Sequence, residues 1–133
     1  MKASYVFAGA ALVAAIFGLA FVLAPAQTMA LYDITLDAAG LFVTRLLGAA
    51  FLGYAVINWL VRNAGPTRER QTVALGLFVS LGVGFIASLL AQLDGVANSL
   101  GWLTVALYLV FSLGFGYVRF MGEGAAVGAQ MAR

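Results

Sequence analysis

Apolar residues fill the chain in four long blocks separated by short polar segments. The blocks cover residues 5–24, 41–61, 72–91 and 100–118. Each is close to the roughly 20 apolar residues that a helix needs to cross the hydrocarbon core of a bilayer. Helices are expected because lipid offers the backbone no hydrogen-bond partners, and the alternating pattern of a barrel strand is absent. The pattern therefore predicts an all-α, polytopic membrane protein built as a four-transmembrane-helix bundle.

The segments between the blocks carry turn-forming and polar residues. The first of them contains a short outer segment, residues 27–39. We expect residues 29–40 to form a short helix on the outer surface, with Asp33 and Asp37 on one face. Residues 122–133 consist mainly of small residues and are interpreted as a mobile tail. The chain, residues 1–133, is expected to form a single membrane domain.

Composition agrees with this class and excludes several kinds of chemistry. Of the 133 residues, 64% are hydrophobic and 9% are charged, whereas about a quarter are charged in a soluble domain. There is no Cys and no His, which removes disulfides, thiol chemistry, histidine-ligated haem and the usual zinc sites. We expect no cofactor and no metal. The net charge of +2 and the scattered basic residues give no sign of nucleic-acid binding.

The charges predict an orientation. The N-terminus, the second connection and the C-terminal end hold six of the seven basic residues: Lys2, Arg62, Arg68, Arg70, Arg119 and Arg133. The first and third connections contain no Lys or Arg, only Asp33, Asp37 and Asp94. Because basic segments stay on the cytoplasmic side, both termini are expected to be cytoplasmic. The predicted location is the inner (plasma) membrane, as a multi-pass protein.

Small residues recur at helical spacing in the third block. Four of them lie four residues apart on one helix face: Gly76, Ser80, Gly84 and Ser88. Small side chains allow close approach of helix backbones in a bilayer. We interpret this face as a packing surface; the alternative is a polar, water-accessible seam along the hydroxyl groups.

Arg45 lies inside the second block, about four residues from its start. On a helix it shares a face with small residues, namely Gly48, Ala49 and, at the edge, Gly53. That face is therefore expected to point into the bundle, with Tyr54 and Asn58 on the opposite side. Three roles for Arg45 remain open: its stem extends to the interface, it pairs with Asp94 or with Asp33 or Asp37, or it binds an anion.

Aromatic residues cluster near the predicted ends of the blocks: Tyr5, Tyr32, Trp59, Trp102 and Tyr117. Trp and Tyr are enriched where a membrane meets water. We interpret them as interfacial anchors.

The segments RLLGAAFLGYAVINWLVR and GWLTVALYLVFSLGFGYVRF resemble uncharacterised small four-helix inner-membrane proteins of bacteria, a family of unknown function. The resemblance covers the second to the fourth block. It implies a membrane-embedded four-helix fold and supplies no activity.

Function is expected to be non-catalytic. The sequence shows no nucleophile–base pair, no intramembrane carboxylate and no phosphate-binding loop. The expectation is an accessory or scaffold subunit or a self-associating bundle, with membrane lipids as partners and a homo-oligomer or a larger membrane complex as its assembly. The alternative is a small channel or transporter for an anion or a lipid, with Arg45 as the binding charge.

Overall fold

The computed structural model describes residues 2–133, and within that range every regular element is a helix. The long helices are α1 (Ala3–Leu23), α3 (Ala38–Val61), α4 (Arg68–Leu93) and α5 (Gly101–Phe120), and the short ones are α2 (Pro25–Ala30) and α6 (Glu123–Met131). Four helical stretches are long and apolar enough to cross a membrane, the last of them running from α5 into α6. The predicted all-α class with four long apolar helices is confirmed.

Local chemistry sets the helix boundaries. Pro25 is the first residue of α2, and the preceding Ala24 leaves the helical region (φ −141°, ψ 59°), which ends α1. Asp37 caps α3, because its Oδ1 accepts a hydrogen bond from the backbone N–H of Gly40 at 2.7 Å. Thr67 caps α4 in the same way through the N–H of Arg70, at 3.3 Å.

The outer segment differs from the prediction of one short helix over 29–40. Its helix begins earlier, at Pro25, because proline is well suited to the first helical position. The chain then turns at Asp33, which has a positive φ of 58°, and Asp37 serves as the cap of α3. Asp33 and Asp37 therefore do not share a helix face.

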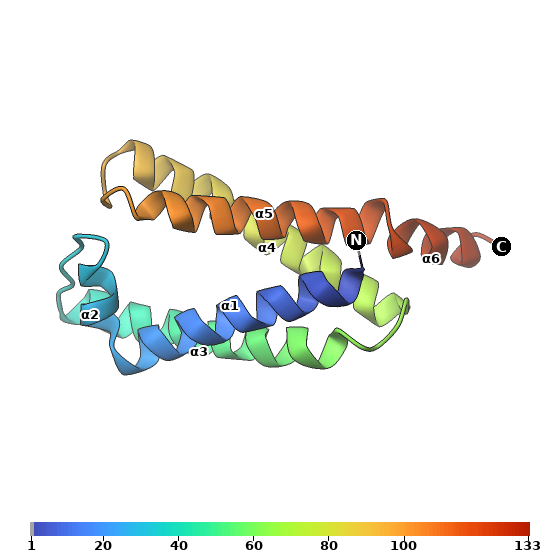
Figure 1. Ribbon diagram of the computed structural model, residues 1–133, viewed down its shortest axis with the longest axis horizontal. Coiled ribbons are helices and arrows are strands. Elements are labelled where there is room, and N and C mark those ends of the chain that lie inside the picture. Colours follow the sequence, from blue (N-terminus) through green and yellow to red (C-terminus); the bar gives the residue numbers. More distant parts are fainter. Residues whose placement is uncertain (1) are drawn as a thin grey trace.

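The helices form two hairpins, α1 with α3 and α4 with α5 (Figure 1). In the first, Gly18 and Gly48 bring the backbones together: a Cβ added to Gly48 would lie 2.9 Å from the carbonyl oxygen of Gly18. In the second, Gly84 lies directly against the ring of Tyr108. Small residues thus allow close packing within each hairpin.

The hairpins meet at one end in an apolar core. The ring of Phe7 on α1 contacts that of Phe115 on α5 edge-on, with centroids 5.0 Å apart. Both rings are fully buried. The core cluster consists of Ala3, Val6, Phe7, Ala10, Ala74, Leu77, Phe115 and Val118.

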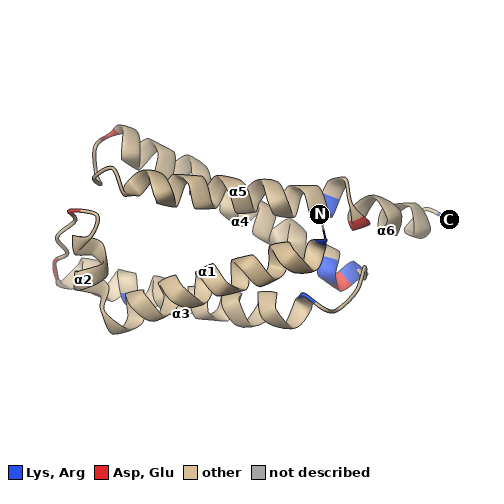
Figure 2. Cartoon of the chain, viewed as in Figure 1, with Lys and Arg blue, Asp and Glu red and all other residues tan. Residues whose placement is uncertain are grey.

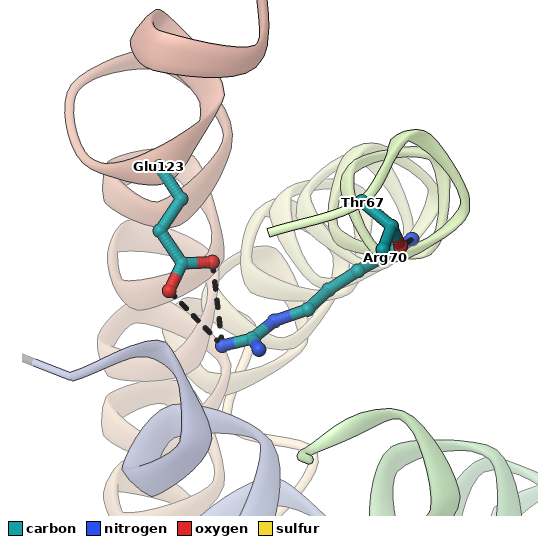
Figure 3. Close-up of polar contacts among 3 residues, drawn as sticks. All are labelled: Thr67, Arg70 and Glu123. Carbon is teal, nitrogen blue, oxygen red and sulfur yellow. Dashed lines mark hydrogen bonds and ion pairs between the residues drawn. The ribbon is translucent and has the colours of Figure 1, made fainter. Parts of the chain in front are cut away.

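The C-terminal segment, predicted to be a mobile tail, contains α6. Its Glu123 accepts a hydrogen bond from Arg70 Nη2, and both carboxylate oxygens lie 3.4 Å from that nitrogen (Figure 3). Arg70 is only 4% exposed, and its guanidinium carbon lies 5.4 Å from the centroid of the Phe7 ring. One side chain therefore joins α4, α6 and α1.

Charged residues gather at the two ends of the molecule (Figure 2). The end with both termini and the α3–α4 connection carries most of the basic residues and is called the basic end. The opposite end, with the α2–α3 and α4–α5 connections, carries Asp33, Asp37 and Asp94 and is called the acidic end.

Candidate functional site: a cleft between the two hairpins

The cleft lies between the hairpins and has a volume of about 470 Å³. On α5 its lining runs from Gly101 to Phe115, which corresponds to about 21 Å along the helix axis. At the basic end it stops at the core, because Ala10, Leu77 and Phe115 belong both to its lining and to the core cluster. The space is therefore elongated, and packed apolar side chains close it at the basic end.

The side of the cleft between α3 and α4 is open. Helix α3 packs on α1 and α2 and makes at most marginal contact with α4 or α5. Lining residues on this side are accordingly exposed, including Ala50, Tyr54 and Ser80. A molecule can enter laterally between the hairpins without passing the core.

Apolar and aromatic side chains make up most of the lining. Eight aromatic rings contribute: Phe17, Phe21, Tyr32, Phe51, Tyr54, Tyr108, Phe111 and Phe115. None of the lining residues is charged. Because an unpaired charge is costly in such surroundings, the cleft is suited to a neutral and largely apolar molecule.

A polar bridge joins the hairpins at the acidic end and is centred on Tyr32. The carbonyl oxygen of Tyr32 accepts a hydrogen bond from the N–H of Asn98 at 3.1 Å. Asn98 Nδ2 donates to the carbonyl of Leu31 at 2.9 Å, and Thr104 Oγ1 donates to the Tyr32 hydroxyl at 3.2 Å. This Tyr32 bridge and the core hold the two hairpins together at opposite ends of the cleft.

Asn58 is the most deeply buried polar residue of the lining, with 1% of its surface exposed. Its Nδ2 donates to the carbonyl of Tyr54 at 2.7 Å. Its Oδ1 is buried and has no hydrogen-bond partner among residues 2–133. Buried acceptors are nearly always paired in folded proteins, with protein groups or with water, so this atom is a candidate acceptor for a donor bound at this end of the cleft.

Arg45 lies outside the cleft. Its side chain is exposed, as are those of Asp33, Asp37 and Asp94. Within residues 2–133 the ion pair found within 4.0 Å joins Arg70 to Glu123, so the proposed pairing of Arg45 with Asp94, Asp33 or Asp37 is not formed. The reason is the direction of α3: the neighbouring Thr44 faces the cleft and is buried, which turns Arg45 away from the α4–α5 hairpin.

The small residues singled out in the sequence have different surroundings. Gly84 contacts Tyr108 and Gly48 contacts α1, whereas Gly76 and Gly53 have nothing within 4 Å of an added Cβ, and Ala49 is exposed. Ser80, Gly84 and Ser88 also line the cleft. The hydroxyl of Ser88 donates to the carbonyl of Phe85 at 3.1 Å, so it is already satisfied within α4.

Sequence reasoning missed the two residues that define the polar ends of the cleft. Tyr32 was interpreted as an interfacial anchor, but it is 8% exposed and bridges the hairpins. Asn58 was placed opposite the inward face of its helix, yet it is buried in the cleft wall. The available signal for Asn58 was a lone amide among apolar residues, which lipid-facing helix surfaces rarely carry.

One comparison with known proteins gives a result. The family model described as a domain of unknown function (DUF8292) matches residues 8–127. The chain belongs to this family. The DUF8292 match includes every residue that lines the cleft. No curated protein and no solved structure matches the chain.

Proposed function

We propose that the chain is a non-catalytic, multi-pass protein of the inner (plasma) membrane that binds a neutral lipophilic molecule in its cleft, as an accessory component. The observation that carries the proposal is a cavity of about 470 Å³ lined by eight aromatic rings and by no charged side chain. Small-molecule sites have volumes of roughly 300–1,000 Å³ and are mainly apolar, with a few polar groups that orient the ligand. The cleft has this size and this chemistry.

Four long apolar stretches and the unequal charges of the two ends support the membrane placement. Under the positive-inside rule the basic end lies in the cytoplasm, together with both termini. The lateral opening between α3 and α4 then faces lipid, so the membrane itself is the source of the ligand.

The closed ends of the cleft favour a small lipophile over a helix from a partner protein. The apolar core closes the cleft at the basic end, and the Tyr32 bridge joins the hairpins at the acidic end. A partner helix would have to push the hairpins apart, and the Tyr32 bridge and the core oppose that movement.

The lining of the cleft also disfavours two other functions, anion transport and catalysis. A transported anion needs a positive group along its path, and Arg45 projects outside the cleft. The polar groups of the lining are hydroxyls and amides, which orient a ligand but offer no acid–base pair. Arg45 is then left to contact the headgroups of surrounding lipids.

Photolabelling in liposomes tests the proposal. The probe is a saturated long-chain primary alcohol with a diazirine near the middle of its chain. Upon illumination we expect label on peptides that line the cleft, above the level on outward-facing peptides of the same helices. Mass spectrometry of the digested protein measures the distribution.

Two adjacent alanines of α3 provide the matched variants. Ala50 lines the cleft, whereas Ala49 is exposed and does not line it. Ala50→Phe should reduce cleft labelling several-fold by filling the space, and Ala49→Phe should leave it unchanged. Uniform label over all lipid-facing surfaces, unaltered by Ala50→Phe, would contradict the proposal.

A further inference from the structure

We infer that Asn58 is the headgroup-binding residue of the cleft and that its ligand is a neutral lipophile carrying a hydroxyl or N–H donor. This inference rests on the function proposed above and specifies its ligand. It begins from Oδ1 of Asn58, the atom of a lining residue that is fully buried without a hydrogen-bond partner within residues 2–133.

The orientation of the amide is determined by its surroundings. The carbonyl of Tyr54 lies 2.7 Å from one end of the amide, and a carbonyl accepts hydrogen bonds only. That end must therefore be the NH₂ group, and the remaining end is the oxygen. The atom of Asn58 that has no partner at all among the described residues is consequently an acceptor, which favours a ligand that donates.

The position of Asn58 determines which way the ligand lies. Asn58 is three residues before the end of α3, at Val61, near the core that closes the cleft. The rest of the lining toward the acidic end is dominated by rings such as Phe51, Phe21 and Phe17. A ligand therefore places its polar head near the core at the basic end. Its apolar tail extends along the aromatic rings toward the Tyr32 bridge at the acidic end.

The chemical class of the ligand follows from two features of the cleft: its lining is uncharged, and Oδ1 of Asn58 requires a donor. The uncharged lining excludes a phosphate or carboxylate head, since neither would find a counter-charge. An ether, an ester or a hydrocarbon has no donor for Oδ1. Long-chain alcohols and mono- or diacylglycerols combine a neutral apolar body with a hydroxyl donor.

A pair of photoactivatable probes tests this requirement directly. One is the long-chain alcohol described above, and the other is its methyl ether, which has the same chain and an oxygen that cannot donate. In the wild-type protein we expect half-maximal cleft labelling at an about threefold to tenfold lower concentration of the alcohol than of the ether, as for one hydrogen bond. This comparison needs no mutation.

Asn58→Leu removes the acceptor and keeps the branching of the side chain at Cγ, so it should make the two probes equivalent. Ser88→Ala is the matched control, because that hydroxyl lines the cleft but is already bonded to Phe85; it should preserve the preference for the alcohol. Equal labelling by both probes in the wild type would overturn the inference, since a water molecule would then satisfy Oδ1, while the proposed function would stand. Failure of both probes to label the cleft would overturn the inference together with the proposed function.

Discussion

Glu123, the first residue of α6, lies 3.4 Å from Arg70 in the first turn of α4. The arginine is 4% exposed and the glutamate 34%. Arg70 is therefore the charge that water cannot solvate if its partner is removed. Its Nε has no partner, and the neighbouring Gln71 has both amide atoms buried without partners. Glu123 thus provides the counter-charge for a cation held inside the basic end, and it holds α6 against the bundle.

Loss of the counter-charge should destabilise the fold. Glu123→Gln leaves Arg70 buried without an ionised partner, so we expect a loss of about 1–3 kcal/mol, between the values for exposed and buried pairs. Thermal unfolding in mild detergent, followed by circular dichroism, measures it. Arg70→Met combined with Glu123→Gln should recover part of the loss, and additive effects of the two changes would show that the pair is not coupled.

The docking of α6 should also depend on Gly124. A Cβ at this position would collide with the carbonyl oxygen of Arg119 and come within 2.8 Å of Gln71 Oε1. Gly124→Ala should therefore detach α6 and make residues 122–133 sensitive to limited proteolysis. Gly128→Ala is the control on the same helix, because its added Cβ meets nothing within 4 Å. Equal protease resistance of both variants would contradict this role of Gly124.

Within the second hairpin, Gly84→Leu should force α4 away from α5. A side chain there overlaps the ring of Tyr108, and overpacking of this kind costs about 1–3 kcal/mol or more. Gly76→Leu places the same side chain two turns away in open space and should be tolerated. The comparison is made by thermal stability in detergent; a wild-type midpoint for Gly84→Leu would mean that the hairpin repacks without cost.

Much of the fold could be predicted because four apolar runs of about 20 residues favour long helices. Apolar length alone gave four helices, and the Gly84 contact follows from small-residue spacing. The partner of each helix face could not be predicted, because a single sequence does not say which helices are neighbours. Asn58 illustrates this limit: its burial depends on α3 pairing with α1 while leaving its other side to the cleft.

The Arg70–Glu123 pair was missed for a related reason. The two residues are 53 positions apart, and the glutamate lies in a segment of mostly small residues that does not indicate a docked helix. Arg45, in contrast, can be recognised from the sequence because it is a charge inside an apolar block. In the structure Arg70 is buried and Arg45 is exposed. Burial decides which arginine needs a partner, and burial depends on tertiary packing.

Orientation in the membrane is tested with cysteines introduced into a chain that has none. Asp94→Cys at the acidic end should react with a membrane-impermeant maleimide in intact cells. Arg68→Cys at the basic end should react only after the membrane is permeabilised. Both positions are exposed in the structure, so accessibility of the side chain does not bias the comparison. The reverse labelling pattern would invert the proposed topology.

Arg45 should act independently of Asp94. Because no ion pair joins them, the effects of Arg45→Met and Asp94→Asn on thermal stability should add within experimental error. Arg45 is seven residues into α3, about 10 Å along the axis, so its long stem can carry the guanidinium toward the headgroup level. Stabilisation by phosphatidylglycerol over phosphatidylcholine should therefore be smaller in Arg45→Met than in the wild type. If both proteins respond equally to phosphatidylglycerol, Arg45 makes no specific contact with the lipid phosphate. If the effects of Arg45→Met and Asp94→Asn are coupled, the acidic end closes around this arginine in detergent.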